Sequence, residues 1–172
     1  ETLSLSHNNL TSFVAENTYF ADSFDLSNNQ LTNLVLNNAS FYSFYVGSNN
    51  LTTITIQGDV SFFIIIVLSN NQFSDLDFTG VNFDYESILY LGNNTFDKVP
   101  TGAYPGNIVY SSNNTSFDLG SYSAFTSCDP DNVGNVTITN SPNLQTIIFK
   151  NGFNHTEITC NEGGTVFQNP AL

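Results

Sequence analysis

One short pattern of apolar residues and asparagine returns every 19 to 23 residues through residues 1–115. Its first copy is Leu3-x-Leu5-x-x-Asn8-x-Leu10-x-x-Phe13, where x is any residue. The later copies begin at Phe24, Phe44, Ile66, Leu89 and, in a weaker form, Ile108. Self-similarity at such a period is typical of a solenoid, in which each repeat packs only on its neighbours. The chain is therefore predicted to be a stack of similar turns.

The internal order of the pattern predicts what each part does. Apolar residues two apart place both side chains on one face of a short strand. The asparagine that follows three residues later is expected to turn inward where the chain leaves the sheet, because its amide can pair with backbone groups of adjacent turns. The predicted buried ladder consists of Asn8, Asn29, Asn49, Asn71, Asn94 and Asn113.

The rest of each turn also lacks a helical pattern. Strand-like pairs follow about ten residues after the first pair in several turns, at Leu34-x-Leu36, Ile54-x-Ile56 and Leu76-x-Phe78. Their period-2 alternation predicts an extended or irregular back face. We therefore expect a mostly β, flattened solenoid with little or no α-helix.

The register blurs beyond Asn114, where strand candidates occur at Val136-x-Ile138, Ile147-x-Phe149 and Ile158-x-Cys160. The sequence does not say which of these lie on the front. Residues 1–172 are expected to form one unit of about eight turns, with regular repeats over 1–115 and irregular repeats over 116–172.

The repeat resembles that of the leucine-rich repeat family, L-x-x-L-x-L-x-x-N-x-L, over residues 1–115. Residues 89–100 are also similar to the leucine-rich ectodomains of receptor-type kinases of oomycetes and related protists. The resemblance implies an extracellular recognition role. It further implies that partners are bound on the front strands, where Tyr45 and Tyr90 occupy the x of L-x-L.

The two ends of the sequence read as one motif when they are joined. Pro170, Ala171 and Leu172 followed by residues 1–5 give P-A-L-E-T-L-S-L, which matches P-N-L-Q-T-I-I-F at residues 142–149. We therefore expect the solenoid to continue into further copies, with Leu3, Leu5, Pro170 and Leu172 at the junction. This continuity favours a filament in which the partner of the chain is the chain itself.

The charge balance excludes some partners. The formal net charge is −13, and the only cations are Lys98 and Lys150. Nucleic acid and anionic membrane surfaces are disfavoured because both are bound mainly through Lys and Arg. The longest apolar stretch, Phe62 to Leu68, is much shorter than the roughly 20 residues that span a bilayer, so no membrane insertion is expected.

Several features indicate an extracellular or cell-surface chain. Cys128 and Cys160 form an even number of cysteines, and a disulfide between them is expected. Glycosylation sequons, N-x-S/T, are frequent. Glycans are expected at Asn9, Asn38, Asn50, Asn93, Asn114, Asn135 and Asn154. Asn113 also begins a sequon, but its predicted place in the ladder argues against a glycan there.

The sequence offers no recognisable catalytic motif, and we expect a chain that is not an enzyme and needs no cofactor. His7 and His155 accompany no nucleophile motif, and Asp75 and Asp77 fit solvated strand positions better than an acid/base pair. Asp129 and Asp131 belong to a fragment of a calcium loop that lacks the later bidentate Glu. We interpret that fragment as a turn.

Three functions remain to be weighed. The first is a structural or adhesive surface fibre built by end-to-end continuation of the solenoid. The second is a ligand-binding receptor ectodomain that recognises an extracellular protein or glycan. For this role the aromatic residues at or near variable positions are Phe41, Tyr42, Tyr45, Tyr85, Tyr90, Tyr104 and Tyr122. The third is ice binding, which the T-x-T pairs Thr53-x-Thr55 and Thr137-x-Thr139 support weakly because they do not recur in every turn.

Overall fold

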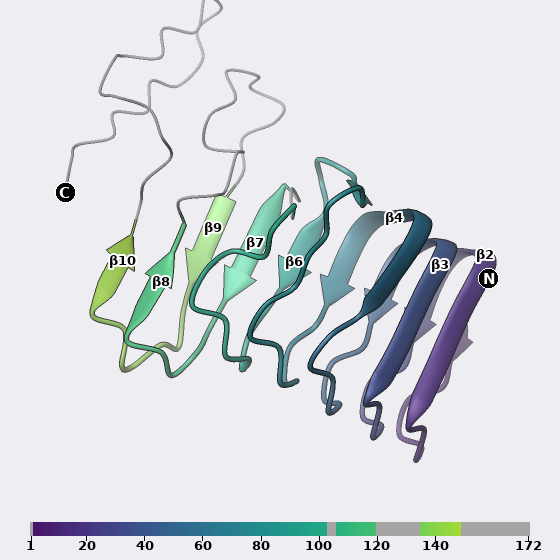
Figure 1. The fold of residues 1–172 in the computed structure, drawn as a ribbon, viewed down its shortest axis with the longest axis horizontal. Helices are drawn as coiled ribbons and strands as arrows, with labels where there is room; N and C mark the ends of the chain where they lie inside the picture. Colours follow the sequence, from purple (N-terminus) through teal and green to yellow (C-terminus); the bar gives the residue numbers. More distant parts are fainter. Residues whose placement is uncertain (1, 103–105, 120–134, 149–172) are drawn as a thin grey trace, which may run out of the picture.

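The computed structural model describes residues 2–102, 106–119 and 135–148. In these ranges the chain forms a parallel β-solenoid of about five turns of about 21 residues, without helix. Figure 1 shows the turns side by side along the long axis of the molecule. It follows that the described ranges hold no helix able to cross a membrane.

Parallel strands from successive turns build the main sheet. Its order is β1 (Leu3–Ser4), β2 (Ser12–Asp25), β3 (Asn33–Tyr45), β4 (Thr55–Val67), β6 (Ile88–Tyr90), β7 (Asn107–Tyr110) and β9 (Asn135–Ile138). The short β5 (Asn82–Phe83) also pairs with β4. A second sheet joins β8 (Ser116–Asp118) to β10 (Thr146–Ile148), again in parallel.

The strands of the main sheet pair so that equivalent positions of successive repeats lie side by side. Pairing aligns the first apolar residue of each repeat, namely Leu3, Phe24, Phe44, Ile66, Leu89, Ile108 and then Val136. The prediction of a mostly β solenoid without helix is thereby confirmed. The described residues account for about five turns rather than the eight expected for the whole chain.

The structure places two of the strand candidates beyond Asn114 in different sheets. These candidates are Val136–Ile138 and Ile147. The strand β9 extends the main sheet by pairing with β7, whereas β10 pairs with β8. The third candidate, Ile158-x-Cys160, lies outside the described residues.

Early turns differ from the expected pair of short strands. Each of β2, β3 and β4 runs for 13 or 14 residues from the back face into the next front strand. Asn17, Asn38 and Gly58 take left-handed backbone conformations within them, with φ of 49°, 47° and 60°. The Asn38 Nδ2 donates to Asn17 Oδ1 at 3.2 Å, and Asp59 N donates to Asn38 Oδ1 at 3.1 Å. A second, exposed asparagine column thus stabilises this bend, and a Cβ at position 58 would collide with the Asn38 amide.

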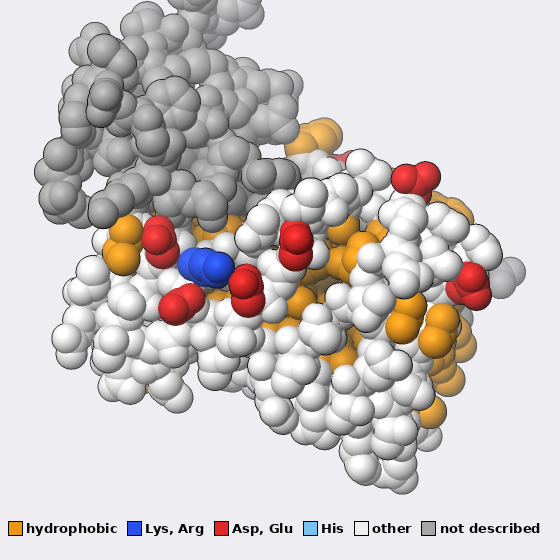
Figure 2. All heavy atoms as spheres, in the orientation of Figure 1, with side chains coloured by type: hydrophobic (Ala, Val, Ile, Leu, Met, Phe, Trp, Pro, Cys, Tyr) orange, Lys and Arg blue, Asp and Glu red, His pale blue; other side chains and the backbone are white. Residues whose placement is uncertain are grey.

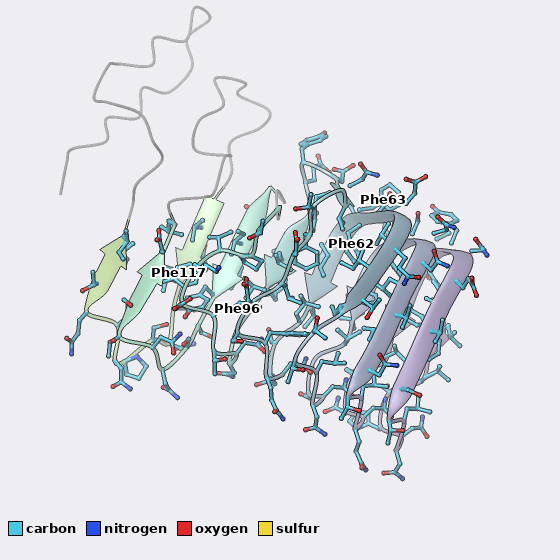
Figure 3. All side chains as sticks on the ribbon, viewed as in Figure 1. Phe62, Phe63, Phe96 and Phe117 are labelled. Carbon is cyan, nitrogen blue, oxygen red and sulfur yellow. The ribbon has the colours of Figure 1, made fainter. Side chains whose placement is uncertain are left out.

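Stacked phenylalanines fill the interior of the first four turns. Phe20, Phe41, Phe62 and Phe83 form one column, with successive ring centroids 5.6, 5.7 and 5.7 Å apart. Phe62 lies in this column, whereas its neighbour Phe63 is half-exposed (Figure 3). Each aromatic contact adds roughly 0.5–1.5 kcal/mol to the burial of the rings.

The interpretation of Phe41 as an exposed aromatic residue is wrong. Its side chain is fully buried, and Phe44 lies beside it with ring centroids 4.5 Å apart. The next residue, Tyr42, does face solvent, and 44% of its surface is exposed. The period-2 alternation of β3 therefore places the phenylalanine inside and the tyrosine outside.

We predict that Phe41→Ala lowers the free energy of unfolding by about 3–5 kcal/mol, because it leaves a cavity in a continuous aromatic stack. The measurement is chemical denaturation followed by circular dichroism. The matched control, Tyr42→Ala on the same strand, should change the free energy by no more than about 0.5 kcal/mol. Equal effects of the two substitutions would contradict the burial of Phe41.

Candidate functional site

The most repeated polar arrangement is the asparagine at the first corner of each turn. In the third turn, Asn49 Nδ2 donates to Val46 O of its own turn and to Leu26 O of the preceding turn, both at 3.0 Å. Its Oδ1 accepts the backbone N–H of Leu31 at 3.0 Å, again from the preceding turn. One buried amide therefore pairs with backbone groups of two turns.

Four asparagines share this geometry, each only 6–8% exposed: Asn29, Asn49, Asn71 and Asn94. Asn8 occupies the same position in the first turn but is exposed. Its Nδ2 donates only within its own turn, to Leu5 O at 3.0 Å and Ser6 O at 3.2 Å. Among the described residues, no earlier turn supplies the remaining partners of Asn8.

The residue before each of these five asparagines is in the left-handed conformation. His7, Asn28, Ser48, Asn70 and Asn93 have φ between 55° and 57°. Non-glycine residues rarely adopt this conformation, and Asn is among those that tolerate it best. The backbone reversal at this position turns the following amide inward, so the corner conformation and the ladder depend on each other.

In the sixth turn the ladder is broken, and the prediction for Asn113 is corrected here. Asn113 is exposed, whereas Ser112 is buried and Asn114 is half-buried. The Asn114 Nδ2 donates to Phe96 O at 2.5 Å and to Thr95 O at 3.2 Å. Asn114 therefore reaches the preceding turn, one residue later than the repeat predicts.

A buried tyrosine lies beside the shifted amide of Asn114. Tyr110 occupies the second apolar position of its turn, is fully buried and stacks on Phe117 with ring centroids 3.8 Å apart. Its hydroxyl donates to Phe96 O at 2.5 Å and so uses a carbonyl that lies at the turn boundary. Burial raises the pKa of Tyr110 above its ordinary value, and hydrogen bonds involving Ser112 and Asn114 oppose this shift in part.

An exposed column of amides lies next to the ladder. Asn9 and Asn50, both predicted glycan sites, are exposed. Gln30 Nε2 donates to Asn9 Oδ1 at 2.9 Å, and Gln72 Nε2 donates to Asn50 Oδ1 at 3.5 Å. In both pairs the glutamine of the following turn thus binds the side-chain oxygen of the predicted glycan site. Sequence reasoning did not single out these glutamines, although both directly follow a ladder asparagine.

The other predicted glycan sites differ in their environments. Asn38 and Asn93 are exposed, and each donates one side-chain hydrogen bond from Nδ2, to Asn17 and Asn70 respectively. Asn135 is the first residue of β9. Asn154 lies outside the described residues.

The outward side of the front strands carries a continuous apolar patch, which we call the front strip. Cross-turn pairing aligns Tyr45, Val67, Tyr90 and Val109 in one column. Ile65 and Ile88 are adjacent partners in the neighbouring column. All six side chains are half-buried. The predicted contact residues Tyr45 and Tyr90 are therefore brought into one surface, two turns apart.

Charged side chains are sparse on the described surface. Figure 2 shows one cationic side chain among acidic ones in a largely uncharged face. This is Lys98, which pairs with Asp75 at 3.3 Å, with 45% and 61% of the two side chains exposed. Such an exposed pair contributes little stability. Hydrogen bonds from Thr79 lower the pKa of the nearby Asp77.

In the described part of the chain, no three His, Cys, Asp or Glu side chains gather as a metal site would require. His7 is exposed, with Asn28 Nδ2 3.5 Å from its Nε2. Several predicted residues lie outside the described ranges, so their arrangement is not described: Cys128, Cys160, Asp129, Asp131, Pro170 and Leu172.

Comparison with protein-family models, curated proteins and solved structures finds no match to this chain. The assignment of the fold as a parallel β-solenoid therefore depends on the register of its strands and the period of its turns.

Replacing Asn49 tests the ladder. We expect Asn49→Ala to lower the free energy of unfolding by about 3 kcal/mol or more, since more than one buried backbone group loses its partner at about 1–3 kcal/mol each. Asn50→Ala changes the exposed neighbour and should stay within about 0.5 kcal/mol. Chemical denaturation of the two variants beside the parent gives both values, and a mild effect of Asn49→Ala would argue against a structural ladder.

The raised pKa of Tyr110 predicts a loss of stability in alkali. An unfolded chain releases this proton near the ordinary pKa of 10.0, whereas the folded chain holds it to higher pH. The contribution is therefore complete below pH 10 and is lost as the pH rises through the folded pKa. Urea unfolding from about pH 8 upward should show this decline, and Tyr110→Phe should lack that component. An identical pH dependence in both proteins would refute the assignment.

Proposed function

We propose that this chain is a non-catalytic extracellular module of the leucine-rich repeat type that forms a structural or adhesive filament by end-to-end continuation of its solenoid. The observation that supports the proposal most is the open first turn. Leu3, Leu5, Leu10, Phe13 and Phe20 are only partly buried against the core. Their counterparts in the next turns are buried, so one more turn would complete the packing of the first.

Unpaired backbone at the same end supports the proposal. The strand β2 spans Ser12–Asp25, but β1 pairs with it only at Phe24 and Asp25. Among the described residues, the other edge of Ser12–Asp22 has no strand beside it. Long open edges of this kind are templates for the addition of another strand. The exposed Asn8 amide adds side-chain groups that a further turn would satisfy.

The leucine-rich repeat assignment has its own support within the chain. The ladder amides bind backbone groups of the preceding turn at four successive positions that the repeat L-x-L-x-x-N specifies. The asparagine-rich surface, with few charged side chains, fits an exported chain whose solubility comes from amides, hydroxyls and N-linked sugars. Cell-surface localisation and the Cys128–Cys160 disulfide belong to this proposal.

The filament version predicts a measurable length. If the whole chain forms about eight turns at about 4.8 Å each, one unit advances about 38 Å along the axis. Electron microscopy of the native material should show fibres with that repeat. Monodisperse particles at high protein concentration, or an axial repeat far from this value, would count against the filament and in favour of the second function below.

An edge variant locates the contact. Leu10→Lys places a charge on the partly buried first turn, where its long side chain can still reach water in an isolated unit. Covering it with another turn would bury that charge, so fibres should be lost while the isolated unit keeps its circular dichroism spectrum. Tyr42→Lys, on the exposed face of an inner turn, is the matched control and should leave fibre formation intact. Fibres that persist in Leu10→Lys would contradict contact through this edge.

The front strip favours a second function, a recognition module of a cell-surface receptor. Tyrosine supplies large contact area at low entropic cost and is enriched where partners bind. Tyr45 and Tyr90 stand two turns apart on a sheet face flanked by polar residues, with Ser4 and Asp25 at one end of their column and Thr137 at the other. An extracellular protein or glycan would be the partner on this surface.

A further inference from the structure

Two overlapping sequons in the sixth turn compete for one glycan. Asn113-Asn114-Thr115 would direct a sugar to Asn113, and Asn114-Thr115-Ser116 would direct it to Asn114. The repeat predicts Asn114 as the accessible acceptor, yet the two side chains lie the other way round. Asn113 is exposed and Asn114 is half-buried.

The amide of Asn114 is committed to the protein interior. Its Nδ2 donates to Phe96 O at 2.5 Å and to Thr95 O at 3.2 Å, and it lies 3.5 Å from the Tyr110 hydroxyl. These contacts join the sixth turn to the fifth beside a fully buried tyrosine. Space for a sugar on this nitrogen would have to come from the turn boundary itself.

The chemistry of the transfer limits how many of these contacts a glycosylated Asn114 could keep. N-glycosylation forms a bond between Asn Nδ2 and the anomeric carbon of a lipid-linked oligosaccharide, and it breaks the bond from that carbon to the diphosphate leaving group. One amide proton is lost to the transferase, so Nδ2 keeps a single N–H. A glycosylated Asn114 could donate to only one of its partners.

Asn113, unlike Asn114, would lose no observed hydrogen bond on glycosylation. Its backbone carbonyl accepts a bond from Asn143 Nδ2 at 3.3 Å, but its side chain has no hydrogen bond to any described residue. A glycan on this exposed amide would displace no observed contact. No described residue therefore engages either hydrogen of the Asn113 Nδ2 before transfer.

The hydrogen bonds that each Nδ2 donates also distinguish the earlier sequons from Asn114. At Asn9 and Asn50 the neighbouring glutamines engage Oδ1, and Nδ2 has no hydrogen bond to a described residue. At Asn38 and Asn93 the Nδ2 donates one bond, which the remaining N–H of a glycosylated amide could retain. Only Asn114 among these residues loses contacts that a glycan cannot replace.

We propose that the folded chain carries N-glycans at Asn9, Asn50 and Asn113 and excludes one at Asn114. The proposal rests on the export of the chain that the proposed function assumes. It assigns the glycan of the overlapping pair to Asn113, whose side-chain amide has no hydrogen bond to a described residue. Asn114 is then a structural residue of the turn boundary.

Two substitutions separate the overlapping sites without touching either asparagine. Thr115→Ala removes the sequon of Asn113 and leaves Asn114-x-Ser116 intact, while Ser116→Ala does the reverse. The full chain is secreted from a eukaryotic host, and occupied sites are mapped by mass spectrometry after enzymatic deglycosylation in heavy-oxygen water. The parent and Ser116→Ala should carry the glycan at Asn113, and Thr115→Ala should lose it without gaining one at Asn114.

A third variant tests whether the transferase selects Asn113 only because its sequon ends in threonine rather than serine. Thr115→Ala combined with Ser116→Thr gives Asn114 a threonine sequon. We expect Asn114 to remain unmodified in the secreted protein or, where modified, to lower its melting temperature relative to the unmodified fraction. A glycan at Asn114 with an unchanged melting temperature overturns the proposal, as does an unmodified Asn113 in the parent.

The outcomes also distinguish this proposal from the function on which it rests. A chain that is secreted with glycans at Asn9 and Asn50 but at Asn114 instead of Asn113 upholds export and refutes the sorting of sites. A chain that reaches the medium without any glycan refutes the sorting as well, and it removes sugars from the proposed explanation of solubility. Retention of the parent inside the host contradicts the extracellular function itself.

Discussion

The stack depends on the buried amide that each turn inserts into the one before it. Strand pairing joins the flat faces of neighbouring turns, but at the corner some backbone carbonyls and N–H groups pair with a side chain instead. Asn29, Asn49, Asn71 and Asn94 satisfy these groups, and each does so for two turns at once. Because an unpaired buried backbone group is costly, these amides lower the cost of burying the corners beside the phenylalanine stack.

Sequence alone was sufficient for the period, the strand class and the asparagines of turns two to five. These follow from a spacing rule that acts identically in each turn, so several copies support each inference. Asn113 and Asn114 are different, because the spacing rule places Asn113 in the ladder, whereas in the structure Asn113 is exposed and Asn114 is half-buried. Asn114 Nδ2 and the buried Tyr110 hydroxyl both donate to Phe96 O, and no spacing rule contains these contacts.

The back face was harder to predict for a related reason. Alternation in Phe41-Tyr42 is the same whichever of the two residues points inward. The contacts of Phe41 with Phe20 and Phe62 in the neighbouring turns show that the phenylalanine does. The bend at Asn17, Asn38 and Gly58 had a visible signal, since Asn17 and Asn38 are one period apart. Its hydrogen bonds run between turns, so their role becomes clear only when the turns are stacked.

If the solenoid is extended at the open edge of β2, as we propose, the ladder also affects the alignment of the added turn. Backbone pairing by itself would accept a strand that has slipped by two residues, because the side-chain faces repeat with that period. An asparagine ladder would not, since its amide reaches the required carbonyl and N–H in one alignment only. The corner amide would therefore select the correct register. A wrongly aligned turn would lack these hydrogen bonds and would dissociate from the edge more readily.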